Sequence, residues 1–318
     1  MSSLLLGRPF KEVFGNTIAE LADTDPRIVV LDGDLGTSTG TELFEAAHPD
    51  RFMQMGISEQ NMLGVAAGLA TVGFVPIVSS FACFVVGRAF DSIRVLIAQP
   101  RLNVKIVGAY TGMLTGKTGK THQIFNDIAI MRSLAGIMVL APADEEEARQ
   151  AIRAMVEVDG PVYMQMPRDP SRLLFTEDYR FEIGRSVVVR EGTDVTLIST
   201  GPQTGRVYEA GEILALRGIE ALILHVPTIK PIDKEGIVRA AQATGVVLVF
   251  EEQSVLGGLG GAVAEVLSEH YPVPVKRFGI QDTYGESGRE DQLLEKYRLS
   301  ANAVAVDVQA TLVGSLDF

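Results

Sequence analysis

The stretch Gln54-Met55-Gly56-Ile57-Ser58-Glu59-Gln60-Asn61-Met62 places one carboxylate, Glu59, directly before a long apolar segment that runs to Phe84. After Met62, small residues alternate with leucine and valine, a composition that lets a helix pack closely on its neighbours. We therefore expect Glu59 at the start of a buried helix. The helix dipole and the unpaired backbone N–H groups stabilise an acid there, so a purely structural role would explain this residue.

An aromatic pair favours a second interpretation of Glu59. Phe81 and Phe84 follow about one helix and one strand later, so the two rings and the carboxylate are expected to share a pocket. A carboxyl group in an apolar pocket favours its neutral form and can exchange a proton with a bound heterocycle. On the residues alone, the structural and the functional interpretation stand about equal.

The composition is that of an ordinary α/β protein. The 318 residues are 47% hydrophobic and 21% charged, which is enough for two domains with cores of their own. A net charge of −12 argues against a nucleic-acid partner and does not favour an anionic membrane. The single cysteine, Cys83, allows no intrachain disulfide, and the first residues lack the features of a signal peptide. We therefore expect a cytoplasmic protein.

Residues 1–182 alternate between helices and buried strands, which predicts a parallel sheet. We expect a first helix over residues 9–22 and an apolar helix over 85–98. The expected strands are 27–31, 76–80, 104–108, 137–142 and 161–166. The acidic run from Asp144 to Glu147 suits a helix start and is interpreted as a solvated face.

A second, smaller domain is expected over residues 183–318, after a linker at 172–181. Strands at 187–189, 195–199, 221–226 and 246–250, with a helix at 204–217, again predict a parallel sheet. The glycine run from Gly257 to Gly261 lacks the spacing of a dinucleotide-binding motif. Close packing of a strand against a helix is its expected role.

The loop over residues 109–121 contains Gly112, Gly116 and Gly119. Loops at the carboxyl ends of parallel strands usually face the ligand site, so we expect these glycines to let the backbone approach a ligand closely. The Gly116-Lys117-Thr118 sequence lacks the upstream glycine of a phosphate-binding loop, so a nucleotide site is not expected.

Seven motifs occur in a characteristic order along the chain. They are Met55–Met62, Ser80–Phe84, Arg88–Arg94, Thr121–Gln123, Arg132–Leu134, Pro142–Asp144 and Gly285–Gly288. In this order and at these intervals they resemble the C-terminal half of transketolase, and the resemblance covers nearly the whole chain. It implies an α/β fold of two parallel-sheet domains, a pyrimidine-binding domain followed by a smaller transketolase C-terminal domain.

The resemblance also implies a cofactor, thiamine diphosphate. In that family the glutamate that matches Glu59 hydrogen-bonds N1′ of the aminopyrimidine and promotes the imino tautomer that takes the proton from thiazolium C2. Phe81 and Phe84 match aromatic residues that flank the pyrimidine, and Asp34 matches an acid near the thiazolium. His122 matches a histidine near the substrate hydroxyls and the reacting carbon, so Glu59 and His122 are the expected catalytic residues.

Three further residues match groups that bind the terminal phosphate of the substrate: Arg8, Ser38 and Arg168. The planar fork of a guanidinium suits a tetrahedral oxyanion. A surface ion pair is the alternative interpretation for each arginine.

Some positions depart from the family pattern. A substrate-contacting histidine about twelve residues before His122 is replaced by Tyr110, or by Ala109 if a gap is allowed. Thr118 stands where an acid is expected, and Gly87 stands where the aromatic loop has its second tyrosine. These changes leave the identity of the sugar substrate undetermined. Two lysines, Lys117 and Lys120, are candidates to hold an anionic group instead.

The motif that binds diphosphate and metal is not recognised in this chain. Thiamine enzymes use Gly-Asp-Gly followed by an asparagine, and Gly33-Asp34-Leu35 with Asn61 imitates that spacing, but Leu35 breaks the motif. We therefore expect no metal ligands here, with Mg²⁺ or Ca²⁺ held through a partner. Because the residues before Arg8 are too few for the amino-terminal domain of a full-length transketolase, we expect that domain on a separate chain.

The resemblance therefore implies the second subunit of a split transketolase, active only with an N-terminal subunit. The expected assembly is a heterotetramer with two copies of each subunit and a homodimer contact between copies of this chain. The expected reaction transfers a two-carbon ketol unit from a ketose, expected to be phosphorylated, to an aldose.

Two alternatives remain open. The β-subunit of a 2-oxoacid dehydrogenase E1 component has a similar size and architecture, although Thr121-His122-Gln123 and Gly285-Glu286-Ser287-Gly288 favour transketolase. A non-catalytic regulatory or structural partner is the second alternative. A carboxylate beside two aromatic rings argues against it, because a scaffold has no need of such a group.

Overall fold

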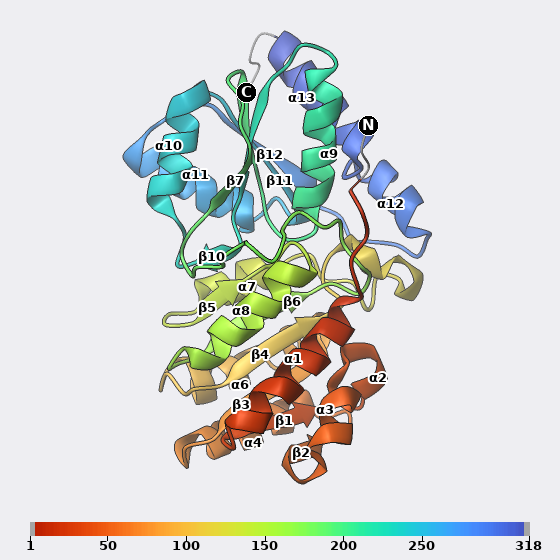
Figure 1. The fold of residues 1–318 in the computed structure, drawn as a ribbon, viewed down its shortest axis with the longest axis vertical. Helices are drawn as coiled ribbons and strands as arrows, with labels where there is room; N and C mark the ends of the chain where they lie inside the picture. Colours follow the sequence, from red (N-terminus) through yellow and green to blue (C-terminus); the bar gives the residue numbers. More distant parts are fainter. Residues whose placement is uncertain (1–3, 315–318) are drawn as a thin grey trace.

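Two β-sheets, one above the other along the long axis of the molecule, organise the fold (Figure 1). The computed structural model describes residues 4–314. We call the part around the first sheet the first lobe and the part around the second sheet the second lobe. The expectation of a two-domain α/β fold with mostly parallel sheets is confirmed.

The first sheet has seven strands in the order β10-β5-β6-β4-β3-β1-β2. Their bounds are β10 Thr228–Lys230, β5 Met138–Leu140, β6 Val162–Met166, β4 Lys105–Ala109, β3 Val75–Phe81, β1 Ile28–Asp32 and β2 Phe52–Gln54. The strands from β5 to β2 run parallel, whereas β10 pairs antiparallel with β5. Because β10 comes from the later part of the chain, the first sheet contains a strand from beyond residue 183.

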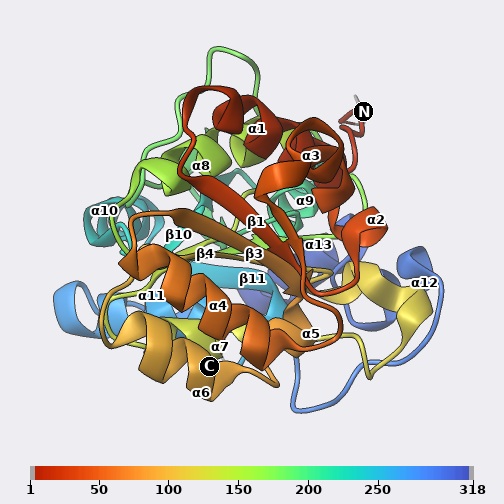
Figure 2. The same ribbon diagram turned by 90° about the horizontal axis from the view of Figure 1, so that it is seen from below.

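Helices cover both faces of this sheet, as Figure 2 shows from below. On one face lie α1 Phe10–Thr24, α3 Thr41–Ala47 and α8 Glu145–Glu157; on the other lie α4 Glu59–Thr71, α5 Ala82–Val85, α6 Phe90–Ser92, η2 Ile93–Ala98 and α7 Asp127–Ser133. The short segments are α2 Gly36–Thr39, η1 Pro49–Arg51 and η3 Met113–Thr118. In α1 the spacing of Phe10, Val13, Phe14 and Ile18 presents one apolar stripe to the sheet.

The second sheet has the order β12-β11-β8-β9-β7, and its edge strand β7 is antiparallel to β9. The strands are β12 Val275–Ile280, β11 Val247–Ser254, β8 Val195–Ser199, β9 Ala221–His225 and β7 Val187–Arg190. The helices are α9 Gln203–Ala215, α10 Lys234–Thr244, α11 Leu259–His270, α12 Glu290–Lys296 and α13 Ala301–Val313. Helices α9 and α13 pack together on one face, and α10 and α11 lie on the other.

The two lobes share buried contacts. One apolar cluster includes Ile128 and Met131 of α7 together with Ile237 of α10 and Leu259 of α11. The chain start also takes part, because Leu6 forms an isolated bridge with Arg172, and Arg172 pairs with Glu209 of α9. No helix within residues 4–314 is long and apolar enough to cross a membrane.

Two local expectations are wrong. Residues 85–98 do not form one helix: α5 ends at Val85, a turn follows, and η2 has π-helical hydrogen bonding. Gly87 accompanies this break, and a side chain at this position would collide with the Cys83 carbonyl. The acidic run at the start of α8 is not a solvated face either, because Asp144 and Glu147 are fully buried.

Candidate functional site

The candidate residues follow neighbouring parallel strands at one edge of the first sheet. Arg168 follows β6, Tyr110 follows β4, Phe81 ends β3 and Asp34 follows β1. Glu59 comes five residues after the end of β2, at the start of α4. Because the carboxyl ends of parallel strands meet at one edge of a sheet, residues far apart in sequence lie side by side there. We call this line of residues, from Arg168 to Glu59, the row.

Glu59 occupies the first position of α4 and is only 1% exposed, as the sequence predicted. Its carboxylate Oε2 accepts a hydrogen bond from Arg88 Nη1 at 3.1 Å, and these two atoms form an ion pair. Arg88 lies in the turn between α5 and α6, with 53% of its side chain exposed. Glu59 thus combines deep burial with a partner that is half in solvent.

Aromatic rings connect the middle of the row. The rings of Tyr110 and Phe81 stack with centroids 4.1 Å apart, and Phe84 lies 5.9 Å from Phe81. His122 meets Phe84 edge-on at 5.3 Å and Phe81 at 6.1 Å. At the far end, the guanidinium of Arg168 lies 5.4 Å from the Tyr110 ring. These contacts link four predicted site residues, Phe81, Phe84, His122 and Arg168. Tyr110 lies between Phe81 and Arg168.

Arg88 joins this row to Glu59, since its guanidinium carbon is 5.5 Å from the Phe84 ring. Cys83 lies beside Phe84 and is partly buried. Burial, with a smaller effect of the nearby Glu59 charge, raises the pKa of the Cys83 thiol to about 12. The thiol is therefore neutral and unsuited to act as a nucleophile.

Asp34 is linked to the segment before Glu59 by hydrogen bonds to the side chain of Gln54. Its backbone N–H donates to Gln54 Oε1 at 2.9 Å, and the N–H of Gly56 donates to the same oxygen at 3.0 Å. Asp34 is exposed and has a left-handed backbone, with φ of 67°. Tyr110, at the end of another strand, has φ of 59°. Such backbone strain in non-glycine residues often accompanies functional sites.

Two predicted residues are not joined to the row by contacts recorded within residues 4–314. Ser38 lies in α2, where its N–H donates to the Leu35 carbonyl at 2.8 Å. Arg8 is exposed, and its Nε lies 3.5 Å from Glu145 Oε2. The surface ion pair that was the alternative interpretation for Arg8 is therefore present.

The second lobe contributes a residue that sequence reasoning missed. Glu290, at the start of α12, faces Asp169, Arg168 and Lys117. Burial, together with the neighbouring Asp169 carboxyl, raises the pKa of Glu290 to about 8, while the two cations oppose the rise. Its Oε1 is buried without a hydrogen-bond partner among the described residues. An acid that holds its proton near neutral pH thus lies beside Arg168.

Two glycines of the loop over residues 109–121 pack against the segment before α12. A side chain at Gly116 would meet the Gly288 carbonyl at 2.8 Å, and one at Gly119, with φ of 77°, would collide with Ser287 Oγ. These glycines therefore permit close packing of the loop on the segment before α12. The prediction that they approach a ligand finds no support in these contacts.

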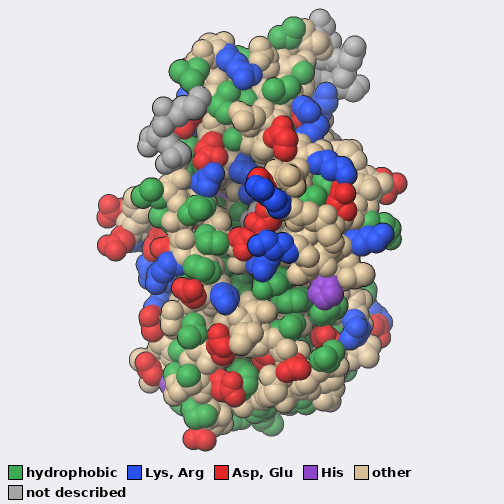
Figure 3. All heavy atoms as spheres, turned by 90° about the vertical axis from the view of Figure 1, so that its right-hand side faces the viewer, with side chains coloured by type: hydrophobic (Ala, Val, Ile, Leu, Met, Phe, Trp, Pro, Cys, Tyr) green, Lys and Arg blue, Asp and Glu red, His purple; other side chains and the backbone are tan. Residues whose placement is uncertain are grey.

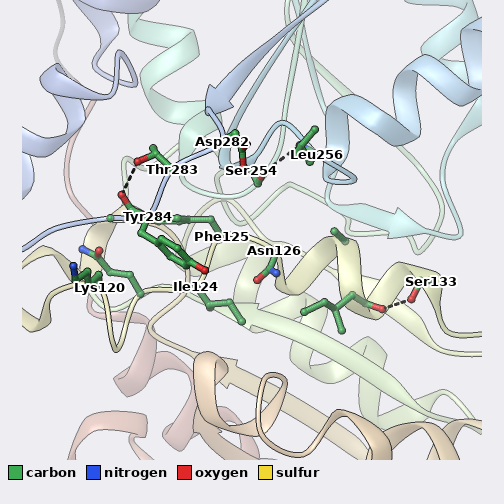
Figure 4. Close-up of a pocket in the computed structure, with 14 residues that line it drawn as sticks. Lys120, Ile124, Phe125, Asn126, Ser133, Ser254, Leu256, Asp282, Thr283 and Tyr284 are labelled. Carbon is green, nitrogen blue, oxygen red and sulfur yellow. Dashed lines mark hydrogen bonds between the residues drawn. The ribbon is translucent and has the colours of Figure 1, made fainter.

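A cleft of about 630 Å³ lies between the lobes, with Lys120 of this loop in its lining (Figure 4). Lys120, Phe125 and Asn126 line it from the first lobe, with Tyr284 and Leu256 from the second. None of the eight predicted site residues lines it. This cleft is therefore distinct from the row at the sheet edge.

The face on the right-hand side of Figure 1 is shown in Figure 3. Basic and acidic side chains gather there in the middle, between the lobes, with apolar side chains below them. In residues 4–314 no cluster of three or more His, Cys, Asp and Glu side chains could hold a metal ion.

The row offers a combination that suits a flat nitrogen heterocycle. The buried carboxyl group of Glu59 can hydrogen-bond a ring nitrogen, and the Phe84 ring can contact a heterocycle face. These residues fit the aminopyrimidine of thiamine diphosphate. The described residues provide no metal cluster that could hold its diphosphate through a cation.

Sequence analysis named Arg88 in a motif and Tyr110 at the place of a substrate-contacting histidine, but it missed their contacts with Glu59 and Phe81. A signal for Arg88 existed, since it is a charged residue in the otherwise apolar run after Phe81. No signal identified the stacking of Tyr110 on Phe81, because the two lie on separate strands.

Comparisons with known proteins identify the family of the two parts of the chain. The family model for the transketolase pyrimidine binding domain matches residues 8–172, and the model for the transketolase C-terminal domain matches residues 184–304. A protein of Methanocaldococcus jannaschii, named as a transketolase C-terminal section, is 43% identical over 295 residues, covering 92% of each chain. A 6-deoxy-6-sulfo-D-fructose transketolase subunit of a Clostridium species is 40% identical, covering 92% of this chain and 91% of that protein.

A solved structure is also similar. It is described as a split gene transketolase in an inactive beta4 tetramer, with 45% sequence identity and a TM-score of 0.87. The match covers 96% of this chain and 99% of that one.

Proposed function

The chain belongs to the transketolase family, and we propose from this that it is the C-terminal subunit of a split transketolase. The proposed reaction transfers a two-carbon ketol unit from a ketose to an aldose. The observation that carries the proposal is the row from Arg168 to Glu59, in which a buried carboxylate lies at one end and a guanidinium at the other. The aromatic residues lie between them.

The residues of this chain would hold the pyrimidine half of thiamine diphosphate. Glu59 would hydrogen-bond N1′, and Phe84 and Phe81 would flank the ring. When bound, the cofactor supplies the nucleophilic carbon that attacks the donor carbonyl. Asp34 is proposed to lie near the thiazolium, because its loop shares Gln54 with the segment before Glu59.

Substrate contacts are proposed on the other side of the rings. His122 is placed edge-on to Phe84, where an imidazole can exchange protons with substrate hydroxyls near neutral pH. Arg168 would bind a terminal anionic group, phosphate in the simplest case, and Lys117 adds positive charge beside it. Arg8 and Ser38 stay proposed members of this anion site.

A partner would supply the diphosphate and the cation, Mg²⁺ or Ca²⁺. We propose an N-terminal transketolase subunit in a heterotetramer with two copies of each subunit, in which copies of this chain contact each other. The similar protein described as an inactive beta4 tetramer supports both self-association and inactivity without a partner. The cytoplasm suits this proposal, because the one cysteine allows no intrachain disulfide.

The experiment is co-expression of this chain with a candidate N-terminal subunit, followed by a ketol-transfer assay. We expect activity from the pair and none from either subunit alone. Robust activity of the isolated chain would contradict the split-subunit proposal. Turnover of a labelled 2-oxoacid without turnover of ketoses would favour a 2-oxoacid dehydrogenase β-subunit instead.

Native mass measurement of the active species should give two copies of each subunit, and a fully active one-to-one pair would contradict the heterotetramer.

A further inference from the structure

Arg88 is the cation that pairs with Glu59 in the described part of the chain. An ionised carboxylate as deeply buried as Glu59 needs a hydrogen-bonded partner, because burial removes the water that would otherwise stabilise its charge. The 3.1 Å hydrogen bond from Arg88 Nη1 to Oε2 fills that need. The pair therefore stabilises the charged form of this carboxyl group.

The two members of the pair are held very differently. Glu59 lies in the first turn of α4 with its side chain buried, whereas Arg88 lies in an irregular turn with its side chain half exposed. The Arg88 backbone is fixed, since its N–H donates to the Phe84 carbonyl at 3.0 Å. Within residues 4–314 the guanidinium makes no recorded hydrogen bond other than the one to Glu59, and it rests against the Phe84 ring. Rotation of the Arg88 side chain into solvent would thus replace one hydrogen bond with bonds to water.

We propose that Arg88 competes with the aminopyrimidine for Glu59, so that the cofactor binds only when the guanidinium swings out. The inference rests on the proposed function, since it takes the pyrimidine as the competitor. The guanidinium only donates and needs the carboxylate, whereas an unprotonated N1′ only accepts and needs the carboxyl hydrogen. Binding therefore breaks the ion pair, and solvent supplies the proton that Glu59 takes up.

The location of Arg88 makes this competition direct. Its guanidinium contacts two of the three groups assigned to the pyrimidine, the Glu59 carboxylate and the Phe84 ring. A hydrogen bond to a charged group contributes more than a neutral one, although exposure of Arg88 to solvent weakens the pair. The pair should therefore lower cofactor affinity by roughly tenfold, which corresponds to about 1.4 kcal/mol.

The test compares thiamine diphosphate affinity among variants of the assembled complex, in the presence of Mg²⁺ and at low and high salt. Arg88→Met and Arg88→Gln remove the competing charge and should bind the cofactor roughly tenfold more tightly than wild type. Because salt screens the ion pair, the difference between wild type and these variants should shrink at high salt. Arg88→Lys keeps a positive charge and should lie between them.

Arg94→Met is the matched control. Arg94 pairs with the exposed Asp91 in the neighbouring helical segment, at 2.5 Å, so its removal should leave the affinity unchanged. Circular dichroism checks that every variant folds. If wild type binds and Arg88→Met binds equally or more weakly, the competition is refuted while the proposed function stands. If folded wild type in the assembled complex binds no thiamine diphosphate, the proposed function fails and this inference fails with it.

Discussion

His225 in the second lobe lies 2.8 Å from Glu147 in the first, measured from Nε2 to Oε2, and both side chains are fully buried. The arrangement suits an imidazole whose Nε2–H donates to the carboxylate while Nδ1 accepts from Thr204 Oγ1 at 2.8 Å. Glu147 Oε1 also accepts from the Tyr179 hydroxyl, and burial with this carboxylate raises the pKa of Tyr179. Polar groups from both lobes and from the connection between them thus meet at one carboxylate.

Removal of this imidazole should weaken the whole fold. His225→Ala leaves a buried carboxylate with one partner fewer, which should lower the free energy of unfolding by about 3 kcal/mol. Denaturant unfolding of the isolated chain measures the change. His270→Ala is the control, because His270 is exposed and 3.8 Å from Glu269, and it should change stability little. Equal losses in the two variants would mean that the interlobe pair has no special role.

A second buried acid should make stability depend on pH. Glu251 accepts hydrogen bonds from the N–H groups of Leu259 and Gly260, yet burial dominates and raises its pKa from 4.5 to about 7. The folded protein therefore holds a proton that the unfolded chain has lost between these values. The stabilising contribution is complete below pH 4.5 and disappears as the pH rises through about 7.

Comparison with Glu251→Gln isolates this contribution, since glutamine keeps an acceptor and does not titrate. At about 1.4 kcal/mol for each pKa unit, wild type should lose about 3 kcal/mol relative to the variant across this range. Urea unfolding at a series of pH values checks it. A constant difference between the two proteins would show that Glu251 ionises in the folded state as it does in the unfolded one.

Phe84 should contribute to cofactor binding and little to the core, because it is only partly buried. In the assembled complex, Phe84→Ala should raise the Kd of thiamine diphosphate roughly tenfold, about the size of a lost aromatic contact with its buried area. Phe278→Ala serves as control, since Phe278 stacks on Phe250 in the second lobe at 4.6 Å. That variant should lose stability and keep its Kd. The reverse pattern would remove Phe84 from the site.

Arg168 should distinguish substrates with and without a terminal anion. Arg168→Met removes a charge-assisted contact, so KM for a phosphorylated sugar should rise about tenfold or more while KM for the unphosphorylated sugar changes little. Steady-state kinetics of the assembled enzyme measure both. Arg185→Met, at an exposed arginine of the second lobe, is the control. Parallel changes for both sugars would place the anion contact elsewhere.

Much of the fold follows from local patterns. The apolar stripe of α1 and the buried strands of both sheets are periodic or continuous in the sequence, so their positions could be predicted within a few residues. The break at residues 86–89 could not, because the stretch over 85–98 is mostly apolar and only Gly87 marks the turn. The burial of Asp144 and Glu147 depends on groups from the linker and the second lobe, which no local pattern reveals.

The candidate site also combines features that the sequence predicts with features that it does not. Glu59 could be placed at a buried helix start because the small residues after it belong to the same helix. Its pairing with Arg88 depends on how the turn after α5 folds back, and the approach of Glu290 to Arg168 depends on how the lobes meet. The close packing of Gly116 and Gly119 on the segment before α12 could not be predicted either, because that segment lies far away in the sequence.

The role of Glu59 is the central claim, and exchange of the cofactor C2 proton in the assembled complex tests it most directly. Glu59→Gln keeps the shape and can still donate a hydrogen bond, but it cannot pass a proton, and Glu59→Ala removes both abilities. Each variant should fold, assemble and lose exchange by roughly a hundredfold or more, the size of a lost general acid–base contribution. Exchange measured by rapid quench and NMR in wild type and Glu59→Gln gives the answer: a loss of this size agrees with the account, and equal rates would make Glu59 a structural acid at the start of α4.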